Sequence, residues 1–314
     1  MAFMTPTYYE DGRKISFPNQ GLKMAGLLFV PDDFDEAKRY PAVVVAHPGG
    51  GVKEQVPSLY GRRLARSGFV VLAFDASHQG ESEGLPRHLE DPYARVEDIR
   101  AAIDCLTTMA FVDRSRIGAM GICAGAGYTM YAVQNDMRIK AAAGVCTWNT
   151  GTWIRDGFPY QGRNACLKAA LEAAADARTK DANGEGPVYT HFVPESEADF
   201  TEDTPQIMKD ASNYYKTERC SYPTSKNLML VQSLDRLATF DAFAFIDTVA
   251  PRPLLFIVGS KADTRHFTED AYNRANEPKE LVVIEGAKHV DLYDQEPYVT
   301  QAFAALEAFF KKNL

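Results

Sequence analysis

Short runs of β-branched and other apolar residues alternate along most of this chain with stretches of helical periodicity. This alternation restricts the fold more than any other feature, because it is typical of a mostly parallel sheet wound with helices. An uninterrupted apolar run also fits a strand that is buried on both faces. The expected strands are Pro41–Ala46, Phe69–Phe74, Arg116–Ile122, Lys140–Cys146, Pro253–Val258 and Leu281–Ile284. The expected helices around them are Leu59–Ser67, Asp91–Ala110, Gly125–Val133 and Thr300–Lys312.

The alternation stops between Thr147 and about Phe245, where the chain is rich in Ala, Asp, Glu and aromatic residues. Roughly a hundred residues without secondary structure would be improbable, so we expect a mainly helical cap here, with Ala165–Arg178 as its clearest helix. The predicted organisation is an α/β core of residues 1–146 and 247–314 with a cap insertion of residues 147–246.

Composition excludes several classes of protein. The 314 residues are 46% apolar and only 24% charged, which favours a large folded core over disorder. A net charge of −8 argues against nucleic acid or an anionic membrane surface as the main partner. We see neither a signal peptide in Met1–Gly21 nor a stretch long enough to span a bilayer. The five scattered cysteines include no Cys-x-x-Cys pair, so we expect no disulfide framework, no metal site and a reducing cytoplasm.

The segment Ile117–Gly125 combines a strand with the start of a helix and contains Gly121-x-Cys123-x-Gly125. Flanking glycines let a strand and a helix pass close to each other around a tight turn, and this turn presents the residue in the middle. A thiol at a helix N-terminus is favoured as thiolate by the helix dipole. We therefore take Cys123 as a candidate nucleophile, although a lone cysteine in such a motif also fits a small packing residue.

Two later loops supply partners for this nucleophile. Asp263 follows the strand Pro253–Val258, and His289 follows the strand Leu281–Ile284. Both lie at carboxyl ends of strands, where ligands bind in open α/β sheets. The order nucleophile, acid, histidine predicts a catalytic triad of Cys123, Asp263 and His289. The alternatives are a turn carboxylate for Asp263 and a structural polar residue for His289.

A glycine run, His47-Pro48-Gly49-Gly50-Gly51, follows the first core strand. Together with the N–H group of Ala124, a backbone N–H of this loop would form an oxyanion hole. Pro48 has no N–H to donate, so we expect Gly49 to be the donor, with Gly50 as the second choice. The run lacks the continuation of a Walker or Rossmann phosphate loop.

These motifs resemble the dienelactone-hydrolase-like branch of the α/β-hydrolases, and more narrowly its group of polyketide hydrolases and polyketide transferases. The resemblance covers nearly the whole chain outside the cap. It implies an eight-stranded sheet, acyl chemistry through a covalent intermediate, and neither metal nor organic cofactor. The segments that carry it are His47–Gln55, Phe74–Gly84, Leu89–Arg100, Gly121–Tyr128, Gly259–Arg265 and Glu285–Asp294. Within them we expect Asp75 to brace its loop, and for Lys53 and Glu54 we leave open whether they orient the oxyanion loop or touch a ligand.

Attack by a cysteine on an ester, thioester or lactone gives an acyl-thioester, which water or another nucleophile resolves. An aromatic-rich cap suits a roomy apolar pocket, so we expect a small-molecule acyl substrate, free or carrier-bound, and take Trp148 and Trp153 as substrate-binding candidates. The alternative interpretation of these aromatics is a core of the cap itself. The predicted activity is hydrolysis; the alternatives are an acyltransferase with the same triad and a non-catalytic binding protein. The sequence leaves the oligomeric state open, a homodimer included.

Overall fold

The computed structural model describes residues 9–314, and its centre is a sheet of eight strands in the order β1-β2-β4-β3-β5-β6-β9-β10. All neighbouring strands from β4 to β10 run parallel, whereas β1 and β2 form an antiparallel edge pair. The six strands expected from the sequence all lie in this sheet; the β1–β2 pair was not predicted. The strands are β1 (Arg13–Asn19), β2 (Leu22–Phe29), β3 (Tyr40–Ala46), β4 (Val70–Phe74), β5 (Val112–Ile122), β6 (Ile139–Val145), β9 (Leu254–Gly259) and β10 (Lys279–Ile284).

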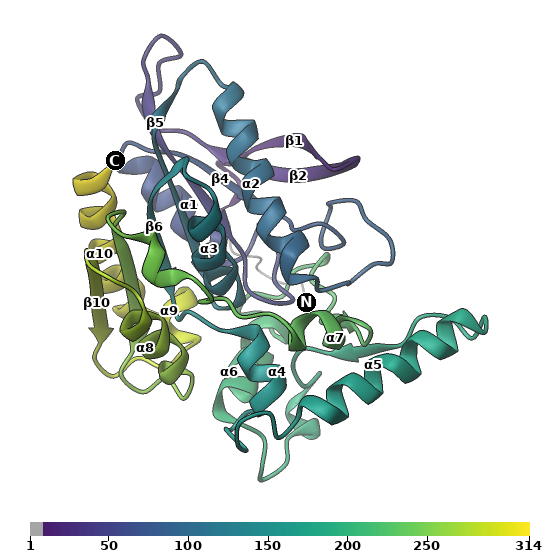
Figure 1. The fold of residues 1–314 in the computed structure, drawn as a ribbon. Coiled ribbons are helices and arrows are strands. Elements are labelled where there is room, and N and C mark those ends of the chain that lie inside the picture. The colour runs from purple at the N-terminus through teal and green to yellow at the C-terminus, as the bar shows by residue number, and fades with distance from the viewer. Residues whose placement is uncertain (1–8) are drawn as a thin grey trace.

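Helices cover both faces of the sheet (Figure 1). Consecutive residues of β3 point to opposite sides: Val43 and Val45 belong to one apolar cluster and Val44 to the other. The first cluster includes residues of α1 (Val56–Arg66) and α10 (Tyr298–Asn313), and the second includes residues of α2 (Pro92–Thr108), α3 (Ala124–Asn135) and α8 (Arg265–Arg274). Burial on both faces explains why the parallel strands have continuous apolar sequences.

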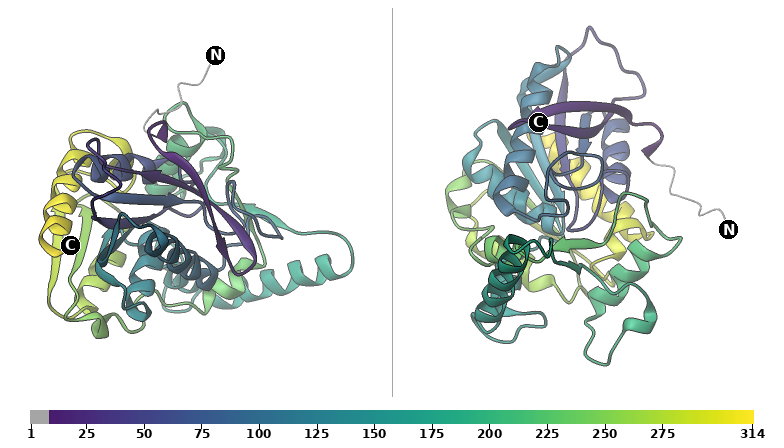
Figure 2. Two further views of the ribbon diagram at one scale, coloured as in Figure 1. Left: turned by 90° about the horizontal axis from the view of Figure 1, so that it is seen from above. Right: turned by 90° about the vertical axis from the view of Figure 1, so that its right-hand side faces the viewer.

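The segment between β6 and β9 contains mostly helices, as its composition suggested. Its longest helix, α5, projects from the body of the molecule (Figures 1 and 2). Two short strands, β7 and β8, pair in an antiparallel fashion within it and were not expected. The elements are α4 (Thr150–Asp156), α5 (Leu167–Ala182), β7 (Tyr189–His191), η2 (Glu197–Asp199), α6 (Gln206–Lys216), β8 (Leu228–Leu230), α7 (Ser233–Ala238) and η3 (Ile246–Val249). Across residues 9–314, none of the helices combines the length and apolarity that a membrane crossing needs.

Candidate active site

Cys123 lies on the tight turn between β5 and α3, with a positive φ of 57°. The two glycines of the motif are required by close backbone contacts. A Cβ atom on Gly121 would lie 2.2 Å from the carbonyl oxygen of Gly125, and one on Gly125 would lie 2.5 Å from those of Ala46 and His47. Any side chain at either position would therefore push α3 away from the sheet. The turn holds a non-glycine residue in the left-handed region, which is strain of the kind found at functional sites.

Two backbone N–H groups converge on the sulfur of Cys123. They belong to Gly49 and Ala124, the residues expected to form the oxyanion hole, and both donate hydrogen bonds to Cys123 Sγ. The carbonyl oxygen of Gly50 accepts a hydrogen bond from Ser225 at 2.7 Å, which ties the glycine run to the segment before β8. If this sulfur attacked a carbonyl carbon, the oxyanion of the tetrahedral adduct would lie close to the same two donors.

The loop that carries Gly49 is fixed from both sides. On the core side, Nε2 of the buried His47 accepts from the Ala76 N–H at 3.0 Å, and Arg95 donates to the His47 carbonyl oxygen at 2.5 Å. On the cap side the Phe192 ring lies against the glycines, 3.1 Å from the place of a Cβ on Gly49. The donors are therefore rigid before a substrate arrives.

His289 is buried, and both of its ring nitrogens have partners. Nδ1 lies 2.5 Å from Thr264 Oγ1, and Nε2 lies 3.1 Å from the hydroxyl of Tyr293. The Tyr293 hydroxyl also hydrogen-bonds Cys123 Sγ. Tyr293 thus connects the thiol to the imidazole, and Trp148 covers the edge of the same ring at a centroid distance of 5.7 Å.

The prediction that Asp263 contacts the His289 ring is wrong. The Asp263 side chain is exposed, and its Oδ2 accepts from the Ile207 N–H in the first turn of α6 at 2.9 Å. At this position the positive end of the helix dipole stabilises the negative charge of the carboxylate. The next residue, Thr264, points inward instead and is 1% exposed. The loop after β9 therefore presents a hydroxyl, and not a carboxylate, to the imidazole.

Burial keeps the thiol and the imidazole neutral. It raises the pKa of Cys123 to about 11, against the hydrogen bonds from Tyr293, Ala124 and Gly49. Burial also lowers the pKa of His289 to about 3. The expectation that the helix N-terminus favours a thiolate at rest is therefore wrong, because desolvation outweighs the dipole here. A Cys123 that acted as a nucleophile would therefore have to lose its proton during the reaction and not before it.

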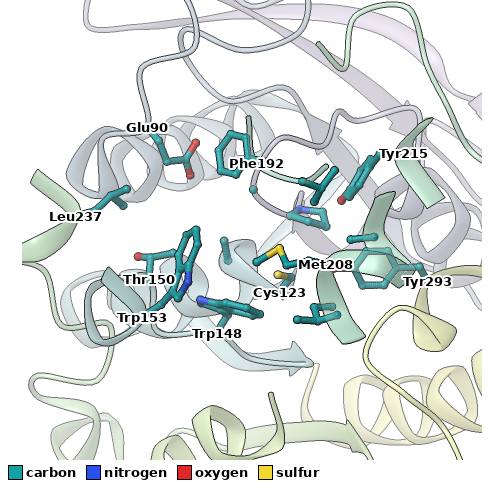
Figure 3. Close-up of a pocket in the computed structure, with 16 residues that line it drawn as sticks. Glu90, Cys123, Trp148, Thr150, Trp153, Phe192, Met208, Tyr215, Leu237 and Tyr293 are labelled. Atoms are coloured by element: carbon teal, nitrogen blue, oxygen red, sulfur yellow. The ribbon is translucent and has the colours of Figure 1, made fainter. Parts of the chain in front are cut away.

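A cavity opens above Cys123 (Figure 3). Its lining is almost wholly apolar, and ten of its sixteen residues come from the predicted cap segment, both tryptophans among them. The contribution of the core consists of Pro48, Gly49, Glu90, Cys123, Ala124 and Tyr293. The cap residues are Trp148, Thr150, Trp153, Phe192, Val193, Ile207, Met208, Ala211, Tyr215 and Leu237.

Lys53 joins a buried ionic cluster and does not line this cavity. Its Nζ lies 2.6 Å from Glu54 and 2.7 Å from each of Asp75 and Glu81. In residues 9–314, these three acids are the group whose spacing would suit a metal ion, but the ammonium group already contacts them all. Asp75 also accepts from the Lys53 backbone N–H at 2.8 Å. Lys53 and Asp75 therefore brace the two loops against each other.

The sequence analysis did not identify three residues of the site as functional candidates: Thr264, Tyr293 and Glu90. Tyr293 follows His289 by four residues, which is the spacing of a helical turn and was the available signal. Glu90 lies in a segment of the family resemblance, Leu89–Arg100, but nothing in its neighbourhood indicated a pocket. Thr264 adjoins the predicted acid, and the sequence does not reveal which of two neighbours points inward.

Comparisons with known proteins agree with this architecture. The model of the dienelactone hydrolase family matches residues 24–213. The uncharacterized protein YcjY of Escherichia coli is 41% identical over 305 residues, 96% of this chain and 99% of that protein. The crystal structure of the hypothetical protein PA2218 from Pseudomonas aeruginosa superposes with a TM-score of 0.90 at 32% identity, with both chains fully covered.

Relatives with a named activity are more distant. The polyketide transferase GrgF of a Penicillium species is 25% identical over 275 residues, 86% of each chain. A thiohydrolase of Eupenicillium brefeldianum is 25% identical over 301 residues, 93% of this chain and 91% of that protein.

Proposed function

This chain belongs to the dienelactone hydrolase family, and we propose that it cleaves an ester, thioester or lactone of an apolar, polyketide-like acyl group through an acyl-cysteine intermediate. One observation carries the proposal. The sulfur of Cys123 lies at the floor of an apolar cavity and meets two converging backbone N–H groups. That is the arrangement that nucleophilic acyl chemistry requires.

The proton route follows from the hydrogen bonds. As the sulfur attacks the substrate carbonyl carbon, its proton passes to the oxygen of Tyr293, which gives its own proton to Nε2 of His289. The carbonyl electron pair moves to oxygen, where Gly49 and Ala124 stabilise the negative charge. When the intermediate collapses, the bond to the leaving group breaks and the departing alcohol or thiol takes the proton from His289.

Deacylation reverses these steps with a second nucleophile. Water attacks the acyl-thioester carbonyl, its proton reaches His289, and the released sulfur recovers a proton through Tyr293. Because both groups are neutral at rest, charge forms only as the oxyanion forms. Nδ1 of the resulting imidazolium donates to Thr264 Oγ1, which holds the ring in position.

The cavity supports an apolar acyl group as the substrate. Apolar and aromatic side chains form most of its lining, as is usual in small-molecule sites, and its walls provide few polar groups for a small hydrophilic acid. Thioesters suit a cysteine especially, since exchange of one thiolate for another is nearly isoenergetic. The names of the thiohydrolase and polyketide transferase relatives point to the same substrate class.

Intact-mass measurement during turnover tests the proposal. We expect a mass increase equal to the acyl group when the protein is mixed with acyl-N-acetylcysteamine thioesters or p-nitrophenyl esters. The adduct should map to Cys123 and be absent in Cys123→Ala. An adduct at another residue, or hydrolysis that persists in Cys123→Ala, would contradict the mechanism.

Transfer to an acceptor other than water is the second candidate, and the apolar cavity favours it because its lining offers few groups that order water. Product analysis with a panel of alcohols and amines separates the two. If the acyl product of one acceptor exceeds the free acid at millimolar acceptor, the activity is transfer.

A further inference from the structure

One end of the cavity is polar, and nothing in the proposed reaction uses it. Glu90 lines the cavity at this end, although only 1% of its surface is exposed to solvent. Thr150 lies at the same end (Figure 3). Glu90 Oε1 accepts from the Tyr128 hydroxyl at 2.8 Å, and Oε2 lies 3.3 Å from Nε2 of Gln79. A carboxylate has about four acceptor positions, so these contacts leave room for one more donor.

A second polar group at the cavity has no partner in the protein. The indole N–H of Trp148 is buried and, within the described part of the chain, has no acceptor. Trp148 as a whole is 5% exposed and lines the same cavity. A buried donor without an acceptor is unfavourable, so a ligand oxygen that accepted from this N–H would be stabilising.

The charge at this end favours a neutral ligand over a cation. The guanidinium of Arg95, also buried, lies 3.7 Å from Glu90 Oε1 and offsets its negative charge. His47, which contacts Arg95, adds no charge, since burial and Arg95 hold its pKa well below the usual value. An ammonium group would therefore gain little, whereas a hydroxyl can donate to Glu90 and accept from an N–H.

We propose that the Glu90 end of the cavity is a subsite for a hydroxyl group on the acyl chain, with Glu90 as its acceptor and Trp148 as a donor to a substrate oxygen. The physiological acyl group is accordingly hydroxylated and not a plain alkyl chain. This inference rests on the proposed function, because it assumes that the acyl group occupies the cavity above Cys123.

Paired thioesters test the subsite. The probes are octanoyl-N-acetylcysteamine and its 3-, 5- and 7-hydroxy derivatives. For at least one position, we expect the hydroxylated thioester to have a kcat/KM about tenfold or more above that of octanoyl, since sites built to bind a hydroxyl discriminate strongly against its absence. Trp148→Phe and Glu90→Gln should reduce this ratio toward one. Trp153→Phe is the matched control, and it should change kcat/KM for both substrates by the same factor.

Equal kcat/KM for all four thioesters in the wild type would overturn the subsite, as would a ratio that both variants retain. Failure of the proposed function looks different, because then no thioester is turned over faster than by Cys123→Ala. In that case binding of octanoic and hydroxyoctanoic acids to Cys123→Ala, measured by calorimetry, decides the subsite alone. A preference for the hydroxy acid that Trp148→Phe reduces would support it, and equal affinities would refute it.

Discussion

The two walls of the cavity are built differently. The backbone positions the wall at the sheet edge: it places Cys123 on the β5–α3 turn, Gly49 on the loop after β3, and Tyr293 on the segment after β10. The wall from the cap consists of large side chains on short elements, such as Trp153 on α4, Met208 on α6 and Leu237 on α7. Exchange of a cap side chain leaves the backbone donors in place, whereas a change at the sheet edge removes a reacting group.

Under the proposed function, this contrast predicts that bond cleavage depends on the sheet edge and substrate choice on the cap. Substitutions at the edge should lower kcat on every substrate, and substitutions in the cap should change the relative kcat/KM of different substrates. The following experiments test the division from its largest consequence to its smallest.

Removal of the proposed nucleophile should have the largest effect. We expect Cys123→Ala to lower kcat for any ester or thioester by about 10³-fold or more, with an unchanged circular dichroism spectrum. Cys166→Ala is the control, a half-exposed cysteine of the cap. Retained turnover in Cys123→Ala would show that Cys123 is a packing residue and that another residue is the nucleophile.

Alkylation measures the resting charge of the same thiol. With its pKa raised to about 11 by burial, only about 10⁻⁴ of Cys123 is thiolate at pH 7. Iodoacetamide should therefore modify Cys123 about a hundredfold more slowly than a free cysteine of ordinary pKa. Because the raised pKa lies above the assay range, the rate should climb about tenfold per pH unit from about pH 7 to about pH 10. A plateau near neutral pH would reveal a thiolate–imidazolium pair at rest.

The bridging hydroxyl of Tyr293 can be removed without loss of the ring. Tyr293→Phe should lower kcat by about 10²-fold, the lower range for a lost proton-transfer group, and should leave KM nearly unchanged. Tyr160→Phe provides the comparison, because Tyr160 is 65% exposed and is not among the residues that line the cavity. Equal kcat values for Tyr293→Phe and the wild type would show that the thiol proton reaches His289 directly.

The partner of His289 can be decided by two neighbouring substitutions. Thr264→Val removes the hydroxyl at Nδ1 and should lower kcat about tenfold, the effect of about 1.4 kcal/mol in the barrier, while Thr264→Ser restores it. Asp263→Asn keeps an oxygen for the Ile207 N–H and should change kcat by less than about threefold. The opposite order of effects would restore Asp263 as the catalytic acid.

The sequence predicted the sheet edge better than the cap for a physical reason. Strands buried on both faces must be continuously apolar, and the β5–α3 turn requires glycine at positions 121 and 125, so both leave a readable pattern. The antiparallel pair β1–β2, whose edge strand β1 is mostly exposed, leaves a weaker pattern. Which of Asp263 and Thr264 points inward depends on the packing of α6 against the loop, a contact between segments far apart in the chain. Pairs such as His289, in a turn, and Tyr293, in the short helix that follows, are detectable only by their spacing of four residues.

The smallest effect should come from the cap. Met208 on α6 lines the cavity and carries no charge or hydrogen bond that the reaction needs. Met208→Ala should enlarge the cavity and shift the preferred acyl length upward by about two carbons. We expect changes in kcat/KM of about three- to tenfold, since burial of one methylene contributes about 0.8 kcal/mol, or about fourfold. The effect should appear mainly in KM, because the donors at Gly49 and Ala124 remain in place. Met137→Ala is the matched control, a 68% exposed methionine after α3 that lies outside the cavity.

The measurement is kcat and KM for a series of thioesters from hexanoyl to dodecanoyl. A uniform fall in kcat across the series would mean that the cap also positions the reacting groups, and the division between the two walls would fail.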